Sequence, residues 1–310
     1  MRFSRLLLCV LSGCLLTGLA KAAEPAKRPN FVFIVSEDNS VHYLRLYGHK
    51  LGVTPNIERL AAEGLTFNHA FSGAPVCSVA RTTLATAMHA PRVGFQYHRK
   101  SALASLPPGV KPWSTVLREQ GYYATNNSKT DYNFKVDMKQ AWDMSSRKAT
   151  WRNRPDKSMP FFHMQSFADS HESSLHFPIK QLEKPTTTLP TEVDLPPYFP
   201  DTPIMRYTMA RYYDRMRIID GHVGRIINQL REDGLLENTF VFYFGDHGGV
   251  LPRSKGYAYE SGLHVPFVVR IPENFKQLVD HKRGSRTDGF VSFIDFGPTV
   301  LNLAGIQPHK

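Results

Sequence analysis

The chain has 310 residues, of which 42% are hydrophobic and 21% are charged. That composition is typical of a folded globular protein and excludes a disordered or fibrous chain. Lysine and arginine (38) outnumber aspartate and glutamate (27), which gives a formal net charge of +11 at pH 7. A basic surface favours anionic partners, but charge alone does not separate nucleic acid from sulfated or phosphorylated molecules. No nucleic-acid recognition motif accompanies the charge, so we expect no nucleic-acid partner.

The first residues have the pattern of a secretory signal peptide. Two arginines precede the apolar run 6–19, which is followed by the small-x-small cleavage signal Ala20-Lys21-Ala22. This arrangement of charge, apolar run and small residues is typical of exported proteins. We therefore predict a signal peptide at 1–22 and one exported domain at 23–310, in the periplasm or secreted.

Membrane attachment is the alternative that the N-terminal sequence raises. The apolar run is too short to span a bilayer, and no later segment is a candidate transmembrane span. The segment Leu11-Ser12-Gly13-Cys14 resembles a bacterial lipoprotein box. Lipid anchoring at Cys14 is the less favoured alternative, because the sequence after this cysteine stays apolar instead of becoming a polar tether.

Apolar runs that fit buried strands alternate with helical patterns along the chain. The first run, 31–35, is followed by a helix signal with Thr54 as N-cap, Pro55 in the first turn and Gly64 as the stop. Further strands are expected at 122–125, 161–167, 239–244 and 265–271, and further helices at 113–120, 202–233 and 293–303. This alternation predicts an α/β fold with a mostly parallel central sheet and helices on both faces. Sites in such sheets form at the carboxyl ends of the strands.

A proline-rich stretch at 184–203 interrupts the alternation of strands and helices. It is longer than an ordinary connection between elements. We interpret it as an ordered surface loop that borders the site, and not as a domain boundary.

Acidic residues directly follow two of the apolar strands. Glu37 and Asp38 end the first, and Asp246 with His247 ends the strand at 239–244. Carboxylates are typical ligands of hard divalent cations, and the carboxyl ends of parallel strands meet at one edge of a sheet. The two pairs therefore predict a metal site.

One cysteine remains in the chain once residues 1–22 are removed. Cys77 lies between the two acidic pairs, in a loop that leads into an expected helix, and Arg81 follows four residues later. The amides and dipole of a helix start favour an anionic sulfur and can also receive an anionic substrate group. Arg81 returns to the same helix face and can hold that group.

These residues resemble the signature of the type I sulfatases, a family of the alkaline phosphatase superfamily. The signature is Cys-x-Pro/Ala-x-Arg, and here it reads Cys77-Ser78-Val79-Ala80-Arg81, with Val79 where Pro or Ala is usual. The resemblance implies that Cys77 is oxidised to formylglycine by a formylglycine-generating or anaerobic sulfatase-maturating enzyme. It also implies an alkaline phosphatase-like fold.

The resemblance extends from Arg28-Pro29-Asn30 to the helix at 295–301, which is nearly all of the expected domain. The metal ligands that it implies are Glu37, Asp38, Cys77, Asp246 and His247. The catalytic residues that it implies are Cys77, Arg81, Lys129, His171 and Lys255. Asp131 stands where the family usually has a histidine close to the residue that aligns with Lys129.

The resemblance implies a mechanism in which the aldehyde from Cys77 is hydrated beside Ca²⁺ and one of its hydroxyls attacks sulfur. Arg81, Lys129 and Lys255 would offset the negative charge of the sulfuryl group. His171 is the first choice for the acid that protonates the leaving group, and Lys255 is the second. Mg²⁺ or Mn²⁺ is a less favoured ion than Ca²⁺, because the flexible calcium sphere tolerates Glu37 in place of a shorter aspartate.

Two segments resemble the N-sulfoglucosamine sulfohydrolase (sulfamidase) branch of the family, namely 197–203 and 167–171. They suggest a sulfated carbohydrate as substrate. Members of the family continue into an antiparallel C-terminal subdomain, which the sequence after the helix at 293–303 does not contain. We therefore expect a C-terminally truncated catalytic domain.

The sequence leaves two other functions open as alternatives. A phosphodiesterase or phosphonate hydrolase of the same superfamily would use the same metal, nucleophile and cations. A catalytically silent protein that binds sulfated glycans is the other alternative, because Glu37, Val79 and Asp131 depart from the usual pattern.

Overall fold

The computed structural model describes residues 28–99 and 103–307. The expected signal peptide and the lipoprotein-like Cys14 lie outside these residues. Within them, no helix has both the length and the apolar character that crossing a membrane requires.

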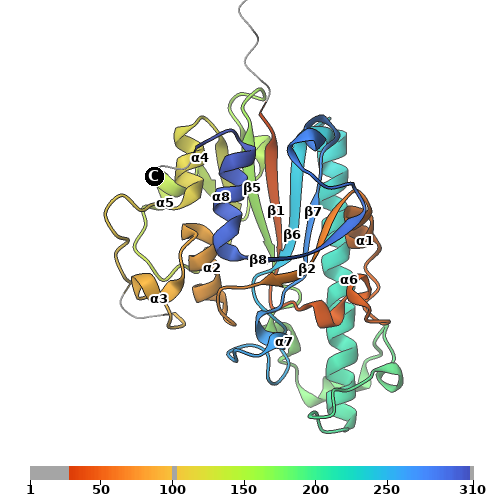
Figure 1. Cartoon of the computed structure of the whole chain (residues 1–310). Helices are drawn as coiled ribbons and strands as arrows, with labels where there is room; N and C mark the ends of the chain where they lie inside the picture. The colour runs from red at the N-terminus through yellow and green to blue at the C-terminus, as the bar shows by residue number, and fades with distance from the viewer. Residues whose placement is uncertain (1–27, 100–102, 308–310) are drawn as a thin grey trace, which may run out of the picture.

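The described residues form an eight-stranded sheet in the order β4-β3-β5-β1-β6-β7-β2-β8 (Figure 1). Strand β7 runs antiparallel to both of its neighbours, and every other neighbouring pair is parallel. The predicted mostly parallel α/β sheet is therefore confirmed. The strands are β1 (Asn30–Ser36), β2 (Gly64–Phe71), β3 (Tyr123–Asn127), β4 (Met144–Ser145), β5 (Phe161–Phe167), β6 (Thr239–Gly245), β7 (Phe267–Arg270) and β8 (Ser285–Ser292).

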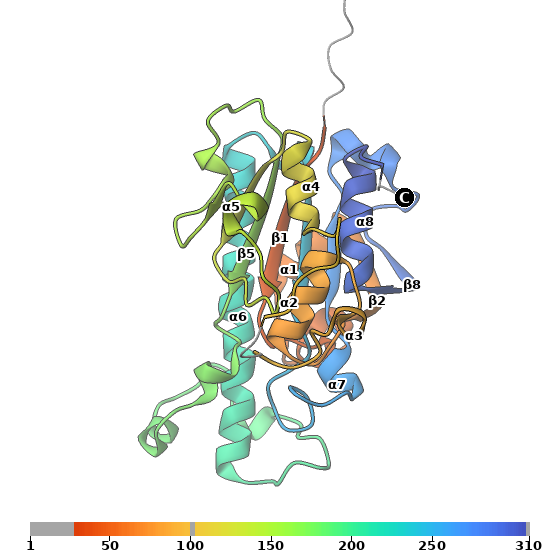
Figure 2. The same ribbon diagram turned by 90° about the vertical axis from the view of Figure 1, so that its left-hand side faces the viewer.

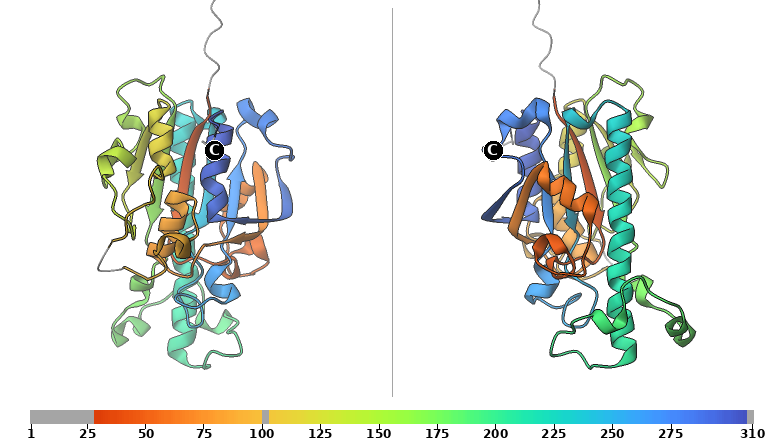
Figure 3. Two further views of the ribbon diagram at one scale, coloured as in Figure 1. Left: turned by 60° about the vertical axis from the view of Figure 1, so that its left-hand side comes forward. Right: turned by 90° about the vertical axis from the view of Figure 1, so that its right-hand side faces the viewer.

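Helices cover both faces of the sheet, as Figures 2 and 3 show from the side. On one face lie α1 (Pro55–Ala62) and α6 (Pro203–Glu232), and on the other lie α2 (Cys77–Thr86), α4 (Trp113–Glu119) and α8 (Phe293–Leu303). The shorter helices are α3 (Ala90–Val93), α5 (Met138–Ala141) and α7 (Glu260–Leu263). The 3-10 helices are η1 (Val41–Tyr43), η2 (Arg45–Tyr47), η3 (Trp151–Asn153), η4 (Glu172–Leu175), η5 (Ile179–Glu183), η6 (Pro190–Glu192), η7 (Leu236–Asn238) and η8 (Glu273–Leu278).

Strand β1 shows why an unbroken apolar run suits the centre of this sheet. Phe31, Phe33 and Val35 pack into the core beneath α2, α4 and α8. Val32 and Ile34 point to the other face, into the core beneath α1 and α6. Because both faces are buried, apolar and polar residues do not alternate, and the strand is apolar from Phe31 to Val35.

The strands β2 and β8 were not predicted, and their sequences explain why. β8 is an edge strand with mostly exposed and half-exposed residues, so its sequence, SRTDGFVS, lacks an apolar run. β2 begins at Gly64, the residue that marks the end of α1, and it carries the polar residues Asn68 and His69. Tertiary pairing, and not local sequence pattern, makes both segments extended.

Helix α1 begins at Pro55, but its start is stabilised by a residue from a distant helix. The Thr54 side chain makes no capping hydrogen bond. Instead the carboxylate of Asp220 in α6 accepts hydrogen bonds from the backbone N–H groups of Asn56 and Ile57, both at 2.9 Å. These bonds satisfy free amides at the helix start and fix α1 against α6.

The proline-rich stretch 184–203 is ordered against the N-terminal end of α6, as predicted. Val193 and Phe199 are buried in the core of that face. Arg206 of α6 donates to the Val193 carbonyl at 3.0 Å. The stretch also reaches the segment after β6, where Arg253 lies over the Tyr198 ring at 4.7 Å from its centroid.

His163 at the centre of β5 should make the fold sensitive to acid. Burial lowers its pKa to about 4 from an ordinary value of 6.5. Between these two pH values the imidazole is protonated in the unfolded chain and neutral in the folded chain. Stability should fall as the pH drops from 6.5 towards 4, by about 3 kcal/mol in total for this residue. His163→Gln should remove this part of the loss, as measured by urea unfolding at pH 7 and pH 5. His281→Gln, at an exposed position, is the control, and an equal pH dependence in all three chains would refute the assignment.

Candidate functional site

The two acidic pairs meet at the carboxyl edge of the sheet. Ser36 lies opposite Gly245 in the parallel register of β1 and β6, so the residues that follow leave the sheet side by side. The Asp38 amide donates to Asp246 Oδ1 at 3.0 Å. Asp38, Asp246 and His247 are fully buried, and Glu37 is nearly so.

Cys77 is the first residue of α2 and lies against these groups. Its Sγ is 3.2 Å from His247 Nε2 and 3.8 Å from Asp38 Oδ1. His247 Nε2 is itself 2.9 Å from Asp38 Oδ1. Carboxylate, imidazole and sulfur atoms thus form one buried group that could hold a metal ion.

The orientation of His247 fits a metal ligand. Its Nδ1 lies 3.0 Å from the carbonyl oxygen of Gly248. A neutral imidazole that donates from Nδ1 keeps the lone pair on Nε2 free for a cation, and this arrangement is usual among histidine ligands. Burial by itself would lower the pKa of His247, but the carboxylates of Asp246 and Asp38 outweigh it and raise the pKa to about 10. The site therefore favours a positive charge between these side chains.

Glu37 has a different role in the geometry from the other expected metal ligands. Its carboxylate contacts Lys129 Nζ at 2.7 Å and Arg81 Nη2 at 3.5 Å. It lies at the same sheet edge but, like Asp246, outside the group formed by Asp38, Cys77 and His247. Its side chain therefore pairs with cations and not with the other expected ligands.

Arg81 is the most constrained of the three expected cations. It is 2% exposed, its Nε donates to Asp246 Oδ2 at 3.1 Å, and its Nη1 donates to Ser166 Oγ at 3.1 Å. Burial alone would lower the pKa of Arg81, but Asp246 and Glu37 raise it. The guanidinium is therefore a charged group in a fixed position, one helical turn from Cys77.

Lys255 and His171 face the same centre from two different loops. Lys255 Nζ lies 2.9 Å from Asp38 Oδ2 and 3.3 Å from His171 Nε2. A hydrogen bond with Cys77 is the main cause that raises the pKa of His171. Burial and the Asp246 charge would raise the pKa of Cys77, but hydrogen bonds with His171 and His247 lower it below its ordinary value.

The structure thus brings together every residue that the sequence analysis proposed for the site. Asp131, at the position where a histidine was expected, instead pairs with Arg99 at 3.2 Å. Its carboxylate also lies 4.0 Å from Lys129 Nζ. The acidic residue therefore orders two cations at the site and donates nothing to Cys77.

Three further residues that the sequence analysis missed support the site. Ser166 binds Arg81, the Glu172 amide donates to Asp38 Oδ2 at 2.9 Å, and the Tyr212 hydroxyl donates to the Asp38 carbonyl. Ser166 is the penultimate residue of a predicted strand, so the rule that sites form at strand ends could have found it. Tyr212 belongs to the apolar stripe of α6, and nothing in its sequence context distinguishes it from a core residue.

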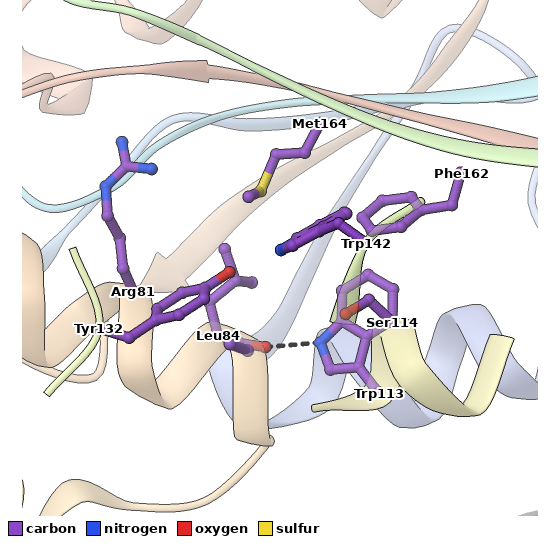
Figure 4. Close-up of a pocket in the computed structure, with 9 residues that line it drawn as sticks. Arg81, Leu84, Trp113, Ser114, Tyr132, Trp142, Phe162 and Met164 are labelled. Atoms are coloured by element: carbon purple, nitrogen blue, oxygen red, sulfur yellow. Dashed lines mark hydrogen bonds between the residues drawn. The ribbon is translucent and has the colours of Figure 1, made fainter. Parts of the chain in front are cut away.

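An open, polar cleft leads from the surface to this site. Glu37, Lys129, Ser166 and His171 line it together with Arg99 and Arg147. A second pocket, behind α2, is mostly apolar and lies beside the stem of Arg81 (Figure 4). There Trp113 Nε1 donates to the Leu84 carbonyl at 2.6 Å, which ties α4 to α2. The cleft therefore opens the charged centre to solvent, and the apolar pocket belongs to the packing that positions α2.

Comparison with known proteins agrees with this geometry. The profile of the family described as Sulfatase matches residues 29–306. The ulvan-active sulfatase of Formosa agariphila is 35% identical over 326 residues, which cover 92% of this chain and 53% of the relative. The N-sulphoglucosamine sulphohydrolase of Homo sapiens is 24% identical, over 96% of this chain and 65% of its own. The chain therefore spans about half of the length of the first of these relatives.

The fold is shared more widely. The phosphonate monoester hydrolase of Agrobacterium radiobacter superposes with a TM-score of 0.69 at 18% identity, over 91% of this chain and 74% of that one. The sulfamidase branch, which two segments had suggested, is a distant relative compared with the ulvan-active sulfatase. Short segments near the site are therefore a weaker guide to the branch than identity over the whole chain.

The buried group of Asp38, Cys77 and His247 should bind Ca²⁺ and gain stability from it. A ligand that binds only the folded chain, at a hundredfold excess over its Kd, stabilises it by about 3 kcal/mol. The thermal unfolding temperature should rise on addition of Ca²⁺ and fall with a chelator. Asp38→Asn should abolish most of this Ca²⁺-dependent shift, whereas Asp280→Asn, an exposed carboxylate, should keep it. Equal shifts in the two variants would contradict the site.

Proposed function

The chain belongs to the sulfatase family, and from this premise we propose that it hydrolyses sulfate esters or sulfamates of sulfated carbohydrates. The observation that carries the proposal is the convergence of Cys77, Asp38 and His247 under three cations, Arg81, Lys129 and Lys255. A sulfate monoester is an anion, and further negative charge spreads onto its oxygens as the bond to the leaving group breaks. Fixed cations at this position stabilise that charge.

We propose that Asp38, Cys77, Asp246 and His247 hold a Ca²⁺ ion, with Glu37 beside them. When bound, the ion supplies a further fixed positive charge for the sulfuryl oxygens. Formylglycine, once made from Cys77 by a maturation enzyme, supplies the hydroxyl nucleophile. Carboxylate-rich groups with variable geometry suit Ca²⁺ better than Mg²⁺, although the His247 nitrogen makes the site softer than an all-oxygen one.

The residues of the chain itself bind and orient the sulfate group. Arg81 cannot swing away, because Asp246 and Ser166 hold two of its nitrogens. Lys129 and Lys255 are only partly exposed, and their ammonium groups are held at the same centre by Glu37 and Asp38. His171, whose pKa is raised, is the group we propose to protonate the leaving oxygen or nitrogen, and Lys255 is the second choice.

Sulfated polysaccharides are the substrate class we favour. The relative named an ulvan-active sulfatase is 35% identical to this chain. The positive net charge attracts polyanions, and an open cleft with Arg99 and Arg147 on its walls admits a chain of sugars. The predicted signal peptide suits an enzyme that meets such polymers in the periplasm or outside the cell.

Modification of Cys77 is the first test of this function. After co-expression with a formylglycine-generating enzyme, mass spectrometry of the peptide should show that Cys77 has lost its sulfur, and a fluorogenic aryl sulfate should be hydrolysed. Cys77→Ala should abolish turnover. Val79→Ala restores the family signature and should raise the modified fraction, because maturation reads that signature.

The same assay distinguishes the alternatives. Faster hydrolysis of a phosphate diester or phosphonate ester than of the sulfate ester would favour the phosphodiesterase or phosphonate hydrolase function. An unmodified thiol with intact binding of sulfated glycans would favour a catalytically silent binding protein.

Arg81→Lys tests the need for a fixed guanidinium. Lysine keeps the charge but cannot bond Asp246 and Ser166 at once. Loss of one preorganised donor to a transition-state oxyanion typically costs about 10²–10³ in rate, so kcat/KM for an aryl sulfate should fall by that order. Arg118→Lys is the matched control, because Arg118 also makes several bonds, to Asp143 and nearby carbonyls, but on α4 away from the cleft. A similar loss in both variants would show that the effect is structural.

A further inference from the structure

Arg253 lies in an aromatic cluster beside the site. Its guanidinium carbon is 4.5 Å from the centroid of the Tyr259 ring and 4.7 Å from that of the Tyr198 ring. Tyr257 stacks on Tyr259 with ring centroids 6.2 Å apart. We call Tyr198, Arg253, Tyr257 and Tyr259 the rim cluster. All three rings are about half exposed, between 46% and 58%.

The charge of Arg253 has no carboxylate partner among the described residues. Within this part of the chain its guanidinium also donates no hydrogen bond, although Tyr198 and Tyr259 hold its position. Ring contacts of this kind leave the N–H groups of a guanidinium able to bind an anion. An arginine with a purely structural role usually pairs with a carboxylate, as Arg270 does with Glu63 and Glu237.

The rim cluster is fixed to the site by the chain that carries Lys255. Lys255 is two residues from Arg253 and contacts Asp38 at 2.9 Å. Between them Ser254 is buried, and the Gly256 amide donates to the Pro75 carbonyl at 2.8 Å, two residues before Cys77. Ser261 Oγ donates to the Arg253 carbonyl at 2.8 Å. The ordered segment that carries Lys255 to Asp38 therefore also carries the rim cluster, two residues from that lysine.

We propose that the rim cluster binds the sugar unit next to the one whose sulfate is hydrolysed, and that this neighbouring unit carries a sulfate or carboxylate group. The proposal rests on the proposed function and assigns to it a polyanionic oligosaccharide as substrate. Arg253 would donate two parallel hydrogen bonds to the anionic group, the geometry that guanidinium and oxyanions share. The exposed faces of Tyr257 and Tyr259 would pack on the C–H face of the sugar ring.

The test measures binding separately from catalysis. The wild-type chain is purified with Cys77 as a thiol, and its binding of sulfated oligosaccharides prepared from ulvan is measured by calorimetry. Arg253→Ala should weaken binding at least tenfold, and Arg253→Lys should weaken it by a smaller factor, because it keeps the charge but not the planar fork. Tyr259→Ala should also weaken binding, whereas Tyr259→Phe should keep most of it.

Arg231→Ala is the control for loss of one surface charge, because Arg231 lies in the last turn of α6, at the other end of that helix from the proline-rich stretch. Thermal unfolding of each variant verifies that it is folded. Equal weakening by Arg231→Ala and Arg253→Ala, equal binding of desulfated and sulfated oligosaccharides that carry no carboxylate, or no binding by the wild-type chain would overturn the proposal.

Failure of the proposed function gives a different result. Hydrolysis of a small aryl sulfate by the matured chain tests the reacting centre, since that probe has no neighbouring sugar. Arg253-dependent binding without such hydrolysis would refute the proposed sulfatase activity and support the sugar-binding role of the rim cluster. Hydrolysis without Arg253-dependent binding would support the sulfatase activity and refute the role of the rim cluster.

Discussion

The site depends on a balance of buried charge at the carboxyl ends of β1 and β6. Asp38 and Asp246 are fully buried, and His247 Nε2 lies 2.9 Å from the Asp38 carboxylate and 3.8 Å from the Asp246 carboxylate. Two buried carboxylates so close together would repel each other and lose their hydration, which is costly unless cations compensate. Arg81, Lys255 and His247 provide that compensation in the protein. The same excess of acidic ligands makes the place suitable for a divalent metal ion.

The scaffold makes this concentration of charge possible by fixing each group from more than one side. The parallel register of β1 and β6 sets the acidic pairs side by side. Cys77 is the first residue of α2, so the start of this helix places its sulfur against them. Tyr212 from α6 and Ser170 from the loop after β5 hold the backbone carbonyls of Asp38 and Glu37. Polar groups whose hydrogen bonds are all made inside the protein cannot relax around a substrate, and this rigidity is what transition-state stabilisation requires.

The proposed function assigns recognition of the substrate and handling of sulfate to different parts of the molecule. The centre around Cys77 is buried and its residues come from α2 and from the ends of β1 and β6. The cleft walls and the rim cluster come mostly from the loops after α3, β3, β4, β5 and β6 and from the proline-rich stretch. Loops can vary without disturbing the sheet. A family can therefore keep one sulfate-handling centre and change the sugar that it selects, which agrees with the 35% identity to an ulvan-active relative and the 24% identity to a sulfamidase.

The sequence by itself determined the α/β class, the central strands and the acidic pairs and Cys77 at their ends. These features are local, because a doubly buried strand must be apolar and its first polar residues must mark its end. Tertiary structure alone decided the inner strand β2 and the edge strand β8, the role of Asp131 as partner of Arg99, and the contact of Tyr212 with Asp38. It also decided that Glu37 faces Lys129 and that Arg253 meets Tyr198, 55 positions away in the chain. Such contacts join residues that are far apart in the chain, and the local sequence around one residue does not identify its partner. Only the folded structure therefore reveals these contacts.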